Sequence, residues 1–505
     1  MGEAGYILLT GATGFLGRYL LRDLLAAGRR VAVLARDAQS APARERVAGL
    51  LAFWGERLGR PLPAPVVLSG DLAAPGLGLG AADRRWLRVN CRAVVHCAAN
   101  VSYQPTAAGE PWETNVNGTH RLLRLCERVG VRALHHLSTA FVCGDRRGVA
   151  REDELDCGGG TNNAYERSKF AAERLLRQAR DVLVTVYRPS VIVGDSRTGY
   201  TSTYHHFYRF LELAVRLSQP AGGAARRRLP LRLPLTGEET QDLVPVDWVS
   251  QALVRLLERP RCHGRTFHLT AARPVRLREV KAIVEGLLHL EGVRWAGPGA
   301  LGSPTSLEEM VLERFRDYWA YLHNSLVFDC RNTREALPGL PPPPFDRDLA
   351  ARLLAFARAD GWGRGRPTPQ MVAARVDCAR YVEHFFPRRA RASALGRVPL
   401  DLTVGLEVRG AGGGQWTCRW GGGELLEVRP GLLPGAAVSY RTDVDTFEEI
   451  VRGRTAPQEA FFARRVEIEG DPEKALKFAA LLGQFVRECP YAPDGEVADA
   501  DALRA

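Results

Sequence analysis

The chain has 505 residues, 46% of them apolar and 25% charged, which is the composition of a globular protein with two or three domains. Its net charge of +12 comes mostly from arginines spread along the chain, with short clusters only at 226–228 and 388–391, so we expect no nucleic-acid partner. No apolar run is long enough to span a bilayer and no leader pattern opens the chain, so we expect a cytoplasmic protein and leave peripheral contact with an anionic membrane surface open.

Short apolar runs alternate with helical patterns over the first half of the chain. The first run, 6–10, precedes the glycines of Gly11-x-x-Gly14-x-x-Gly17 and an amphipathic stretch. Strands that alternate with helices at this spacing predict an α/β fold with a doubly wound, Rossmann-type parallel sheet. The further strand-like runs are 31–35, 66–69, 93–98, 133–138 and 182–187.

The glycine spacing between a strand and a helix is typical of a dinucleotide site, because glycines let backbone N–H groups approach a pyrophosphate at a helix N-terminus. At the end of the second strand, Arg36 stands where NAD sites usually carry a carboxylate, and its guanidinium suits the 2′-phosphate of NADP(H). Asp37 keeps NAD(H) as the less favoured alternative. Arg18 either adds a second donor or is a solvated helix residue.

Tyr165 and Lys169 are four residues apart in a helical pattern, so they share one face, and we expect the ammonium to lower the pKa of the phenol. Ser138 and Thr139 close an apolar strand, where a hydroxyl can donate to a substrate carbonyl. Asn115 either supports a proton relay or bridges backbone groups. With the glycine loop, these residues predict an oxidoreductase in which Tyr165 exchanges a proton with the substrate.

Beyond residue 194 the alternation loosens, and the pattern predicts a small substrate-side region. Residues 205–217 predict an amphipathic helix that either packs in a core or walls an apolar substrate. A domain boundary is expected around 362–370. After it, apolar residues fall on every even position from Val398 to Val408 and Trp416 begins a second alternating strand, so the C-terminal part is predicted as a separate α+β domain. Asp445 with Glu448 is typical of a capping box that begins a helix.

The ten cysteines include no CxxC pair, so we expect neither a metal site nor a disulfide framework. This pattern favours a reducing compartment.

The motifs of residues 6–270 resemble the extended short-chain dehydrogenase/reductase superfamily, and within it the branch of thioester reductases and fatty acyl-CoA reductases. The matching segments are TGATGFLGRYL (10–20), GDL (70–72), HCAAN (96–100), TNVNGT (114–119), LSTAFV (137–142), YERSK (165–169), RPSVIVGDSRTG (188–199) and LVPVDWV (243–249). The resemblance implies that Thr139, Tyr165 and Lys169 are catalytic with Asn115 assisting, and that Asp247 and Trp248 lie on the substrate side. It also implies a cofactor-binding set of Thr10, Gly11, Thr13, Gly14, Phe15, Leu16, Gly17, Arg18, Arg36, Asp71, Leu72, Ala98, Tyr165, Lys169, Pro189 and Val191.

Residues from about 395 to 490 resemble the sterol carrier protein type 2 (SCP2) family. The similarity lies in the alternating strands around Trp416, the segment 453–471 and the helical pattern 473–485. That family binds sterols, fatty acids and acyl-CoA in an apolar tunnel, so Phe461 and Phe462 are expected in a tunnel or core. The expected domains are a reductase over 1–365, a helix and linker over 366–394, an SCP2-like lipid-binding domain over 395–492 and a tail over 493–505.

Three functions remain on these grounds. The first is an NADP(H)-dependent reduction of a long-chain acyl thioester to an aldehyde or alcohol. The second is a 3β-hydroxysteroid dehydrogenase that acts on a sterol, with or without decarboxylation. The third, of another class, is a cofactor-binding protein that transfers or senses lipids, and the Tyr165/Lys169 pair argues against it.

Overall fold

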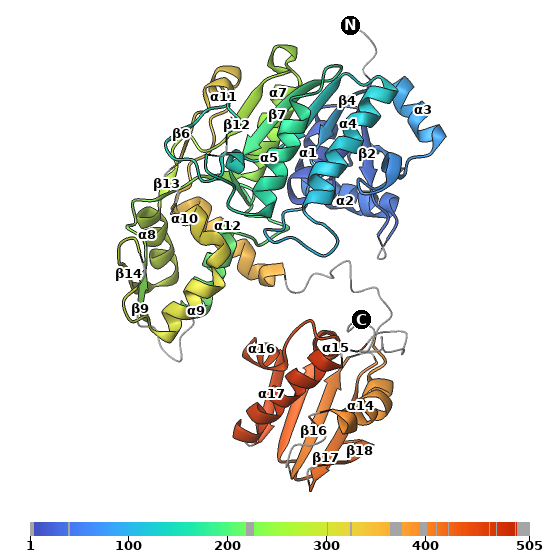
Figure 1. The fold of residues 1–505 in the computed structure, drawn as a ribbon, viewed down its shortest axis with the longest axis vertical. Helices are drawn as coiled ribbons and strands as arrows, with labels where there is room; N and C mark the ends of the chain where they lie inside the picture. Colours follow the sequence, from blue (N-terminus) through green and yellow to red (C-terminus); the bar gives the residue numbers. More distant parts are fainter. Residues whose placement is uncertain are drawn as a thin grey trace. The chain divides into compact units, whose positions relative to one another are not determined.

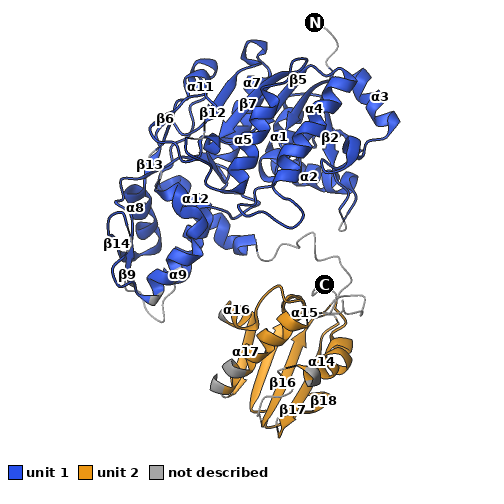
Figure 2. Ribbon diagram, in the orientation of Figure 1, with its two compact units in different colours: residues 1–366 blue, residues 367–505 orange. Residues whose placement is uncertain are grey.

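The computed structural model describes residues 5–38, 41–156, 158–218, 227–299, 301–323, 326–363, 376–393, 395, 401–410, 412–422, 424–463, 465–470, 472–489 and 491. The chain divides into two compact units, Met1–Arg366 and Pro367–Ala505 (Figure 2). Among the described helices, none combines the length and apolar character that crossing a membrane requires.

A parallel sheet forms the centre of the first unit, as the sequence predicts. Its strand order reverses direction between β1 and β4, so the carboxyl ends of these two strands flank a crevice of the kind that binds nucleotides in doubly wound folds. Within the described residues the sheet has seven strands, in the spatial order β12 (Thr266–Leu269), β7 (Leu183–Pro189), β5 (Ala133–Leu137), β4 (Cys91–His96), β1 (Tyr6–Thr10), β2 (Val31–Ala35) and β3 (Val66–Ser69).

Helices cover both faces of this sheet (Figure 1). Successive side chains of a strand point to opposite faces, so Leu9 and Val33 pack in one core with α1 and α7, whereas Leu8 and Leu34 pack in another with α3 and α4. Both cores are almost free of exposed surface, which explains why the strands read as continuous apolar runs. The covering helices are α1 (Phe15–Ala26), α2 (Ala43–Leu58), α3 (Ala81–Asn90), α4 (Gly118–Val129), α5 (Ala164–Leu176) and α7 (Val246–Leu257).

The rest of the first unit includes a group of elements that we call the small lobe, which lies at one end of the unit (Figure 1). The predicted helix over 205–217 is α6, and its apolar residues face the inside of this lobe. The small lobe consists of α6 (Phe207–Ser218), β9 (Arg227–Leu233), α8 (Leu277–Leu288), β14 (Leu290–Trp295), α9 (Ser306–Arg314) and α10 (Trp319–Leu322). Connecting elements are β6 (Val149–Ala150), β8 (Val191–Val193), β10 (Thr240–Gln241), β11 (Leu243–Pro245), β13 (Val275–Arg276), β15 (Val327–Phe328), α11 (Arg331–Ala336) and α12 (Arg347–Ala359).

The second unit is an α+β domain, as the sequence predicts. Its sheet has the order β18-β17-β16-β19-β20 and is antiparallel except between β16 and β19. Trp416, Cys418 and Trp420 alternate into its core. The described elements are α13 (Cys378–Arg380), η7 (Tyr381–Phe385), α14 (Phe386–Ala392), β16 (Leu402–Arg409), β17 (Gly414–Gly421), β18 (Glu424–Pro430), β19 (Val438–Asp443), α15 (Val444–Val451), α16 (Pro457–Phe462), β20 (Val466–Gly470) and α17 (Pro472–Glu488).

Two features of the second unit differ from the sequence interpretation. The segment taken as helix and linker contributes Tyr381, Val382 and Phe386 to the core, because their side chains pack against the sheet and α17. The cap of α15 is Asp443, whose carboxylate accepts from the Thr446 N–H at 2.7 Å, so the prediction that Asp445 begins the helix was wrong. Val398 and Leu400 lie outside the described residues.

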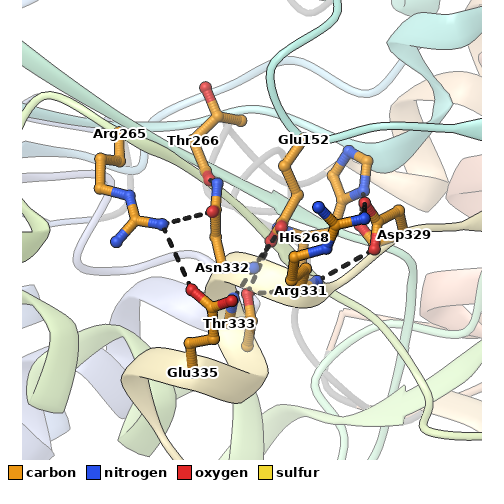
Figure 3. Close-up of polar contacts among 9 residues, drawn as sticks. All are labelled: Glu152, Arg265, Thr266, His268, Asp329, Arg331, Asn332, Thr333 and Glu335. Atoms are coloured by element: carbon orange, nitrogen blue, oxygen red, sulfur yellow. Dashed lines mark hydrogen bonds and ion pairs between the residues drawn. The ribbon is translucent and has the colours of Figure 1, made fainter.

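A buried carboxylate joins three segments of the first unit (Figure 3). Glu152 is 3% exposed and accepts hydrogen bonds from the backbone N–H groups of His268 (2.9 Å), Asn332 (2.6 Å) and Thr333 (3.3 Å), as well as from the Thr333 hydroxyl. It therefore ties the chain after β6 to β12 and to the first turn of α11.

We expect Glu152→Ala to destabilise the first unit by about 2–3 kcal/mol, because it leaves buried N–H groups without acceptors. The matched control is Glu154→Ala, which removes a partly exposed carboxylate that pairs with Arg146 and should cost much less stability than Glu152→Ala. Urea unfolding measures both. Equal losses for the two variants would contradict the role assigned to Glu152.

Candidate functional site

The loop between β1 and α1 is shaped by two glycines. Gly11 has a φ of +73°, and a Cβ there would lie 2.5 Å from the Ala98 nitrogen on the neighbouring β4 side. A Cβ on Gly17 would lie 1.9 Å from the Gly11 carbonyl oxygen, so only glycine lets α1 pack this close to the loop. Gly14 caps α1 without a side-chain hydrogen bond, which leaves the first amides of the helix for an anion such as a phosphate.

A polar cleft of about 330 Å³ opens at the carboxyl ends of β1, β2 and β4. It contains eight of the predicted cofactor residues, namely Thr10, Gly11, Thr13, Gly14, Arg36, Asp71, Leu72 and Ala98. It also contains residues that sequence reasoning missed, among them Arg46, Cys97, Asn100, Glu110 and Thr114. The position at the reversal of strand order and the glycine-lined floor fit a dinucleotide.

Two arginines lie at one end of this cleft. The Arg36 side chain is 70% exposed, and its guanidinium is 3.8 Å from the Asp71 carboxylate. Arg46, on α2, donates to the Arg36 carbonyl at 2.8 Å and to the Thr13 hydroxyl at 3.2 Å. The only sequence signal for Arg46 is a basic residue near the start of the second helix.

Asp37, the residue that kept NAD(H) as an alternative, has a structural role. Its carboxylate accepts from the Ala43 N–H at 2.8 Å and from the Ser69 hydroxyl, and these bonds hold the pKa of Asp37 below its usual value. One carboxylate oxygen thus serves the turn into α2, and the other binds the end of β3.

The other predicted cofactor residues lie outside the walls of the cleft. Arg18 donates to the Thr13 carbonyl at 3.1 Å and to the Tyr200 hydroxyl, so it fixes the loop between β1 and α1. It is therefore not simply a solvated helix residue. Leu16 is buried in the core, and Val191, in β8, pairs with Leu243 of β11. The full set outside the walls is Phe15, Leu16, Gly17, Arg18, Tyr165, Lys169, Pro189 and Val191.

The N-terminal half of α5 carries the predicted catalytic pair. Lys169 is fully buried and donates its ammonium to the Leu137 carbonyl at 2.5 Å, where β5 ends. Burial lowers the pKa of Lys169 to about 8. His96, the last residue of β4, pairs with His136 of β5, so Cys97 in the cleft wall lies next to Leu137, the residue whose carbonyl binds Lys169.

The electrostatics of Tyr165 differ from the expectation. Burial raises the pKa of this half-buried phenol, Glu166 and Cys97 raise it further, and a hydrogen bond with Thr139 lowers it. The prediction that Lys169 lowers this pKa was wrong for this structure, because the ammonium is engaged with the Leu137 carbonyl and desolvation dominates. The phenol therefore stays protonated at neutral pH, which is the form of a proton donor.

Asn115 and Ser138 lie around this pair. Asn115 is buried in a π-helical turn, η2 (Glu113–Asn117), and bonds with its amide to both backbone groups of Asn100 and to the Ser168 hydroxyl. This is the backbone-bridging alternative, and it fixes a residue of the cleft wall. The Ser138 hydroxyl is buried and has no hydrogen-bond partner among the described residues.

The predicted substrate contacts Asp247 and Trp248 do not line any of the cavities that we describe. Asp247 accepts from the Ser196 N–H (2.8 Å) and hydroxyl (2.6 Å), and the Trp248 indole donates to the Leu340 carbonyl at 3.1 Å. Because α7 packs against α1, its first turn faces the interior. These two residues brace loops, and their place on the substrate side stays a prediction.

An almost wholly apolar chamber of about 190 Å³ lies inside the small lobe. Its wall combines residues far apart in the sequence, including Phe210, Leu231, Val284, Phe315 and Trp319. The chamber is joined to α5 through α10: the Asn163 amide that precedes α5 donates to the Tyr321 hydroxyl at 2.7 Å. Next to Tyr321, Leu322 lines the chamber.

The second unit holds a smaller apolar cavity of about 90 Å³ between its sheet and helices. Phe461 lines it, as the tunnel alternative expects, whereas the side chain of Phe462 lies outside the described part. The Tyr381 hydroxyl is buried in the same wall without a hydrogen-bond partner among the described residues.

Comparisons with known proteins match both units. The model of the male sterility protein family (NAD-binding) matches residues 9–253, and that of the SCP-2 sterol transfer family matches residues 392–483. The solved terminal R domain from the myxalamid PKS-NRPS biosynthetic pathway is 29% identical, with a TM-score of 0.58 over 72% of this chain and 92% of that chain.

Two curated relatives are similar over the first unit. The nonribosomal peptide synthetase asaC of Aspergillus flavus is 29% identical over 54% of this chain, and the isonitrile lipopeptide synthase of Streptomyces coeruleorubidus is 36% identical over 55%. The chain spans only 26% and 18% of the lengths of these relatives.

We expect Gly17→Ala to weaken nucleotide binding and to destabilise the first unit by about 1–3 kcal/mol, because the added Cβ collides with the Gly11 carbonyl. The control is Gly49→Ala, on the exposed face of α2 with nothing within 4 Å, which should stabilise by about 0.5–1 kcal/mol. Thermal unfolding with and without NADPH measures both effects. A Gly17→Ala variant as stable as wild type would contradict the packing described.

Proposed function

The chain belongs to the extended short-chain dehydrogenase/reductase superfamily and carries an SCP-2 domain after its first unit, and from this premise we propose that it is an NADP(H)-dependent reductase of acyl thioesters. The observation that carries the proposal is the Tyr165/Lys169 pair on α5, a helix that hydrogen bonds join to the polar cleft through Asn115 and Asn100 and to the α10 wall of an apolar chamber through Asn163. The cleft suits the cofactor, and the chamber suits an acyl chain.

When bound, NADPH supplies the hydride for the thioester carbon. Two residues of the chain act on the carbonyl oxygen of the thioester. Thr139 can donate a hydrogen bond to it, and Tyr165, protonated at neutral pH, can give it a proton. Collapse of the resulting hemithioacetal breaks the carbon–sulfur bond and yields an aldehyde and a thiol. Lys169 holds a positive charge at the end of β5, where it would stabilise the negative charge that develops on the substrate oxygen during hydride transfer.

NADP(H) is the cofactor that these two arginines of the cleft favour. Arg36 and Arg46 can both reach a 2′-phosphate at their end of the cleft, and the Asp37 carboxylate is already engaged with the turn into α2. These contacts support NADP(H) over NAD(H).

A sterol substrate is the second candidate, and the SCP-2 sterol transfer match favours it. The chamber is apolar enough for either ligand. Purified protein is therefore offered NADPH with hexadecanoyl-CoA and, separately, NADP⁺ with a 3β-hydroxysterol, and absorbance at the nicotinamide band reports turnover. Reduction of the thioester supports the proposal, and sterol oxidation without thioester reduction overturns it.

The second unit would bind the lipid substrate and supply it to the first unit. Its cavity is lined by apolar side chains, and tethering a carrier to a reductase raises the local concentration of a poorly soluble ligand to about the millimolar range.

Tyr165→Phe removes the proton donor while it keeps the ring, so we expect kcat to fall by about 10²–10⁴ with little change in NADPH affinity. Turnover is followed by NADPH absorbance and binding by nucleotide fluorescence. Retained turnover would exclude Tyr165 as the acid. If neither wild type nor variant turns over any substrate while both bind NADPH and lipid, the chain is a lipid-transfer or sensing protein.

Arg36→Ala and Arg46→Ala should each weaken NADPH binding by roughly tenfold to a hundredfold, because each removes charge-assisted hydrogen bonds to the 2′-phosphate. NADH binding should hardly change. The control is Arg44→Ala. Arg44 is exposed, lies on the same helix as Arg46 and is outside the cleft wall. Equal effects on NADPH and NADH would argue against a 2′-phosphate site here.

A further inference from the structure

His206 is a buried polar residue in the wall of the apolar chamber. It is 8% exposed, and neither of its ring nitrogens has a hydrogen-bond partner among the described residues. Its backbone has a φ of +47°, a left-handed conformation that side chains rarely adopt. Tyr318 and Tyr321 pack edge-on against the ring, at 5.5 and 5.4 Å between centroids, and hold it in place.

Three other polar side chains of the chamber, Gln241, Lys281 and Glu285, each have a partner, although Glu285 Oε1 has none among the described residues. The Gln241 amide donates to the carbonyls of Thr240 and Tyr321, both at 3.0 Å. Lys281 and Glu285 form an ion pair at 2.7 Å. Buried imidazoles normally satisfy their nitrogens, so an unpaired ring in a ligand-sized chamber indicates a group that pairs with the ligand.

The position of His206 says which part of a ligand it would meet. Its ring contacts Tyr321, whose hydroxyl accepts from Asn163, two residues before Tyr165. The rest of the wall is mostly apolar and includes residues such as Leu229, Val293 and Val311. A chain that enters the chamber from the Tyr165 side, past Tyr321, would therefore meet His206 among apolar side chains.

We propose that His206 determines specificity by hydrogen bonding to an oxygen on the acyl chain, a hydroxyl or a carbonyl between the thioester and the apolar tail. The preferred substrates are then hydroxyacyl or oxoacyl thioesters, and unsubstituted acyl thioesters are disfavoured. This inference rests on the proposed reductase function. A neutral imidazole has one donor and one acceptor nitrogen, so a hydroxyl can use both and a carbonyl only the donor.

Burial keeps the ring in that neutral form, since it lowers the pKa of His206 to about 4. A site built to hydrogen-bond a substrate oxygen discriminates strongly against the analogue that lacks it, because the protein group is then left unpaired.

The test compares kcat/KM for hexadecanoyl-CoA, 3-hydroxyhexadecanoyl-CoA and 3-oxohexadecanoyl-CoA with NADPH. We expect wild type to prefer an oxygenated chain by at least about tenfold, and the order of the two oxygenated substrates tells whether a hydroxyl or a carbonyl is read. His206→Phe keeps a ring without hydrogen bonding. In this variant, the ratio of kcat/KM for the oxygenated thioester to kcat/KM for the unsubstituted one should fall close to one. His205→Phe, the neighbour outside the chamber wall, should keep the preference.

A wild-type enzyme that treats all three thioesters alike overturns the proposal, whether or not the His206→Phe protein folds. A preference that survives in His206→Phe overturns it as well. His206→Asn, which tolerates the left-handed backbone and keeps a donor and an acceptor, should retain part of the preference.

Direct binding separates this inference from the proposed function. Trp295 and Trp319 line the chamber, so their fluorescence reports titration with 3-hydroxyhexadecanoic and hexadecanoic acids without turnover. Tighter binding of the hydroxy acid together with no NADPH oxidation would support the role of His206 and exclude the reductase function. Equal binding together with NADPH oxidation would do the reverse.

Discussion

The hydrogen bond from the buried Lys169 ammonium to the Leu137 carbonyl is the contact on which the candidate site depends. It fixes α5 against the carboxyl end of β5, so Tyr165, one helical turn earlier, lies beside the cleft that opens between β1 and β4. A buried cation needs such an acceptor, and the carbonyl at a strand end supplies it without a second charge. The same burial keeps the Tyr165 phenol protonated, so one arrangement serves both position and acidity.

Two regions of the first unit, both joined to α5, suit different ligands. The sheet edge forms a polar cleft through the glycine loop, Arg36 and Arg46, whereas the small lobe forms an apolar chamber. Hydrogen bonds join α5 to both, through Asn115 and Asn100 on the cleft side and through Asn163 and Tyr321 on the chamber side. A charged cofactor and an apolar chain can thus approach one proton donor from environments suited to each.

The sequence predicted the fold class correctly, and β1, β2 and β3 begin and end where their apolar runs do, because these strands are buried on both faces. The glycine loop was equally readable, since its spacing reflects contacts within one strand–turn–helix unit. Arg46 was missed because a basic residue on an exposed helix carries no local signal. The loop contacts of Asp247 and Trp248 could not be read from the sequence, because the packing of α7 against α1 depends on contacts distant in sequence. The chamber could not be foreseen for the same reason, since segments between 206 and 322 form its wall.

In the proposed reaction, hydride reaches a thioester carbon next to Tyr165. The most direct measurement uses NADPH that carries deuterium at the transferable position of the nicotinamide, with an acyl-CoA substrate and mass spectrometry of the products. We expect deuterium on the former thioester carbon, with free CoA released. Release of CoA with no deuterium in the product, or deuterium on any other carbon, would contradict it.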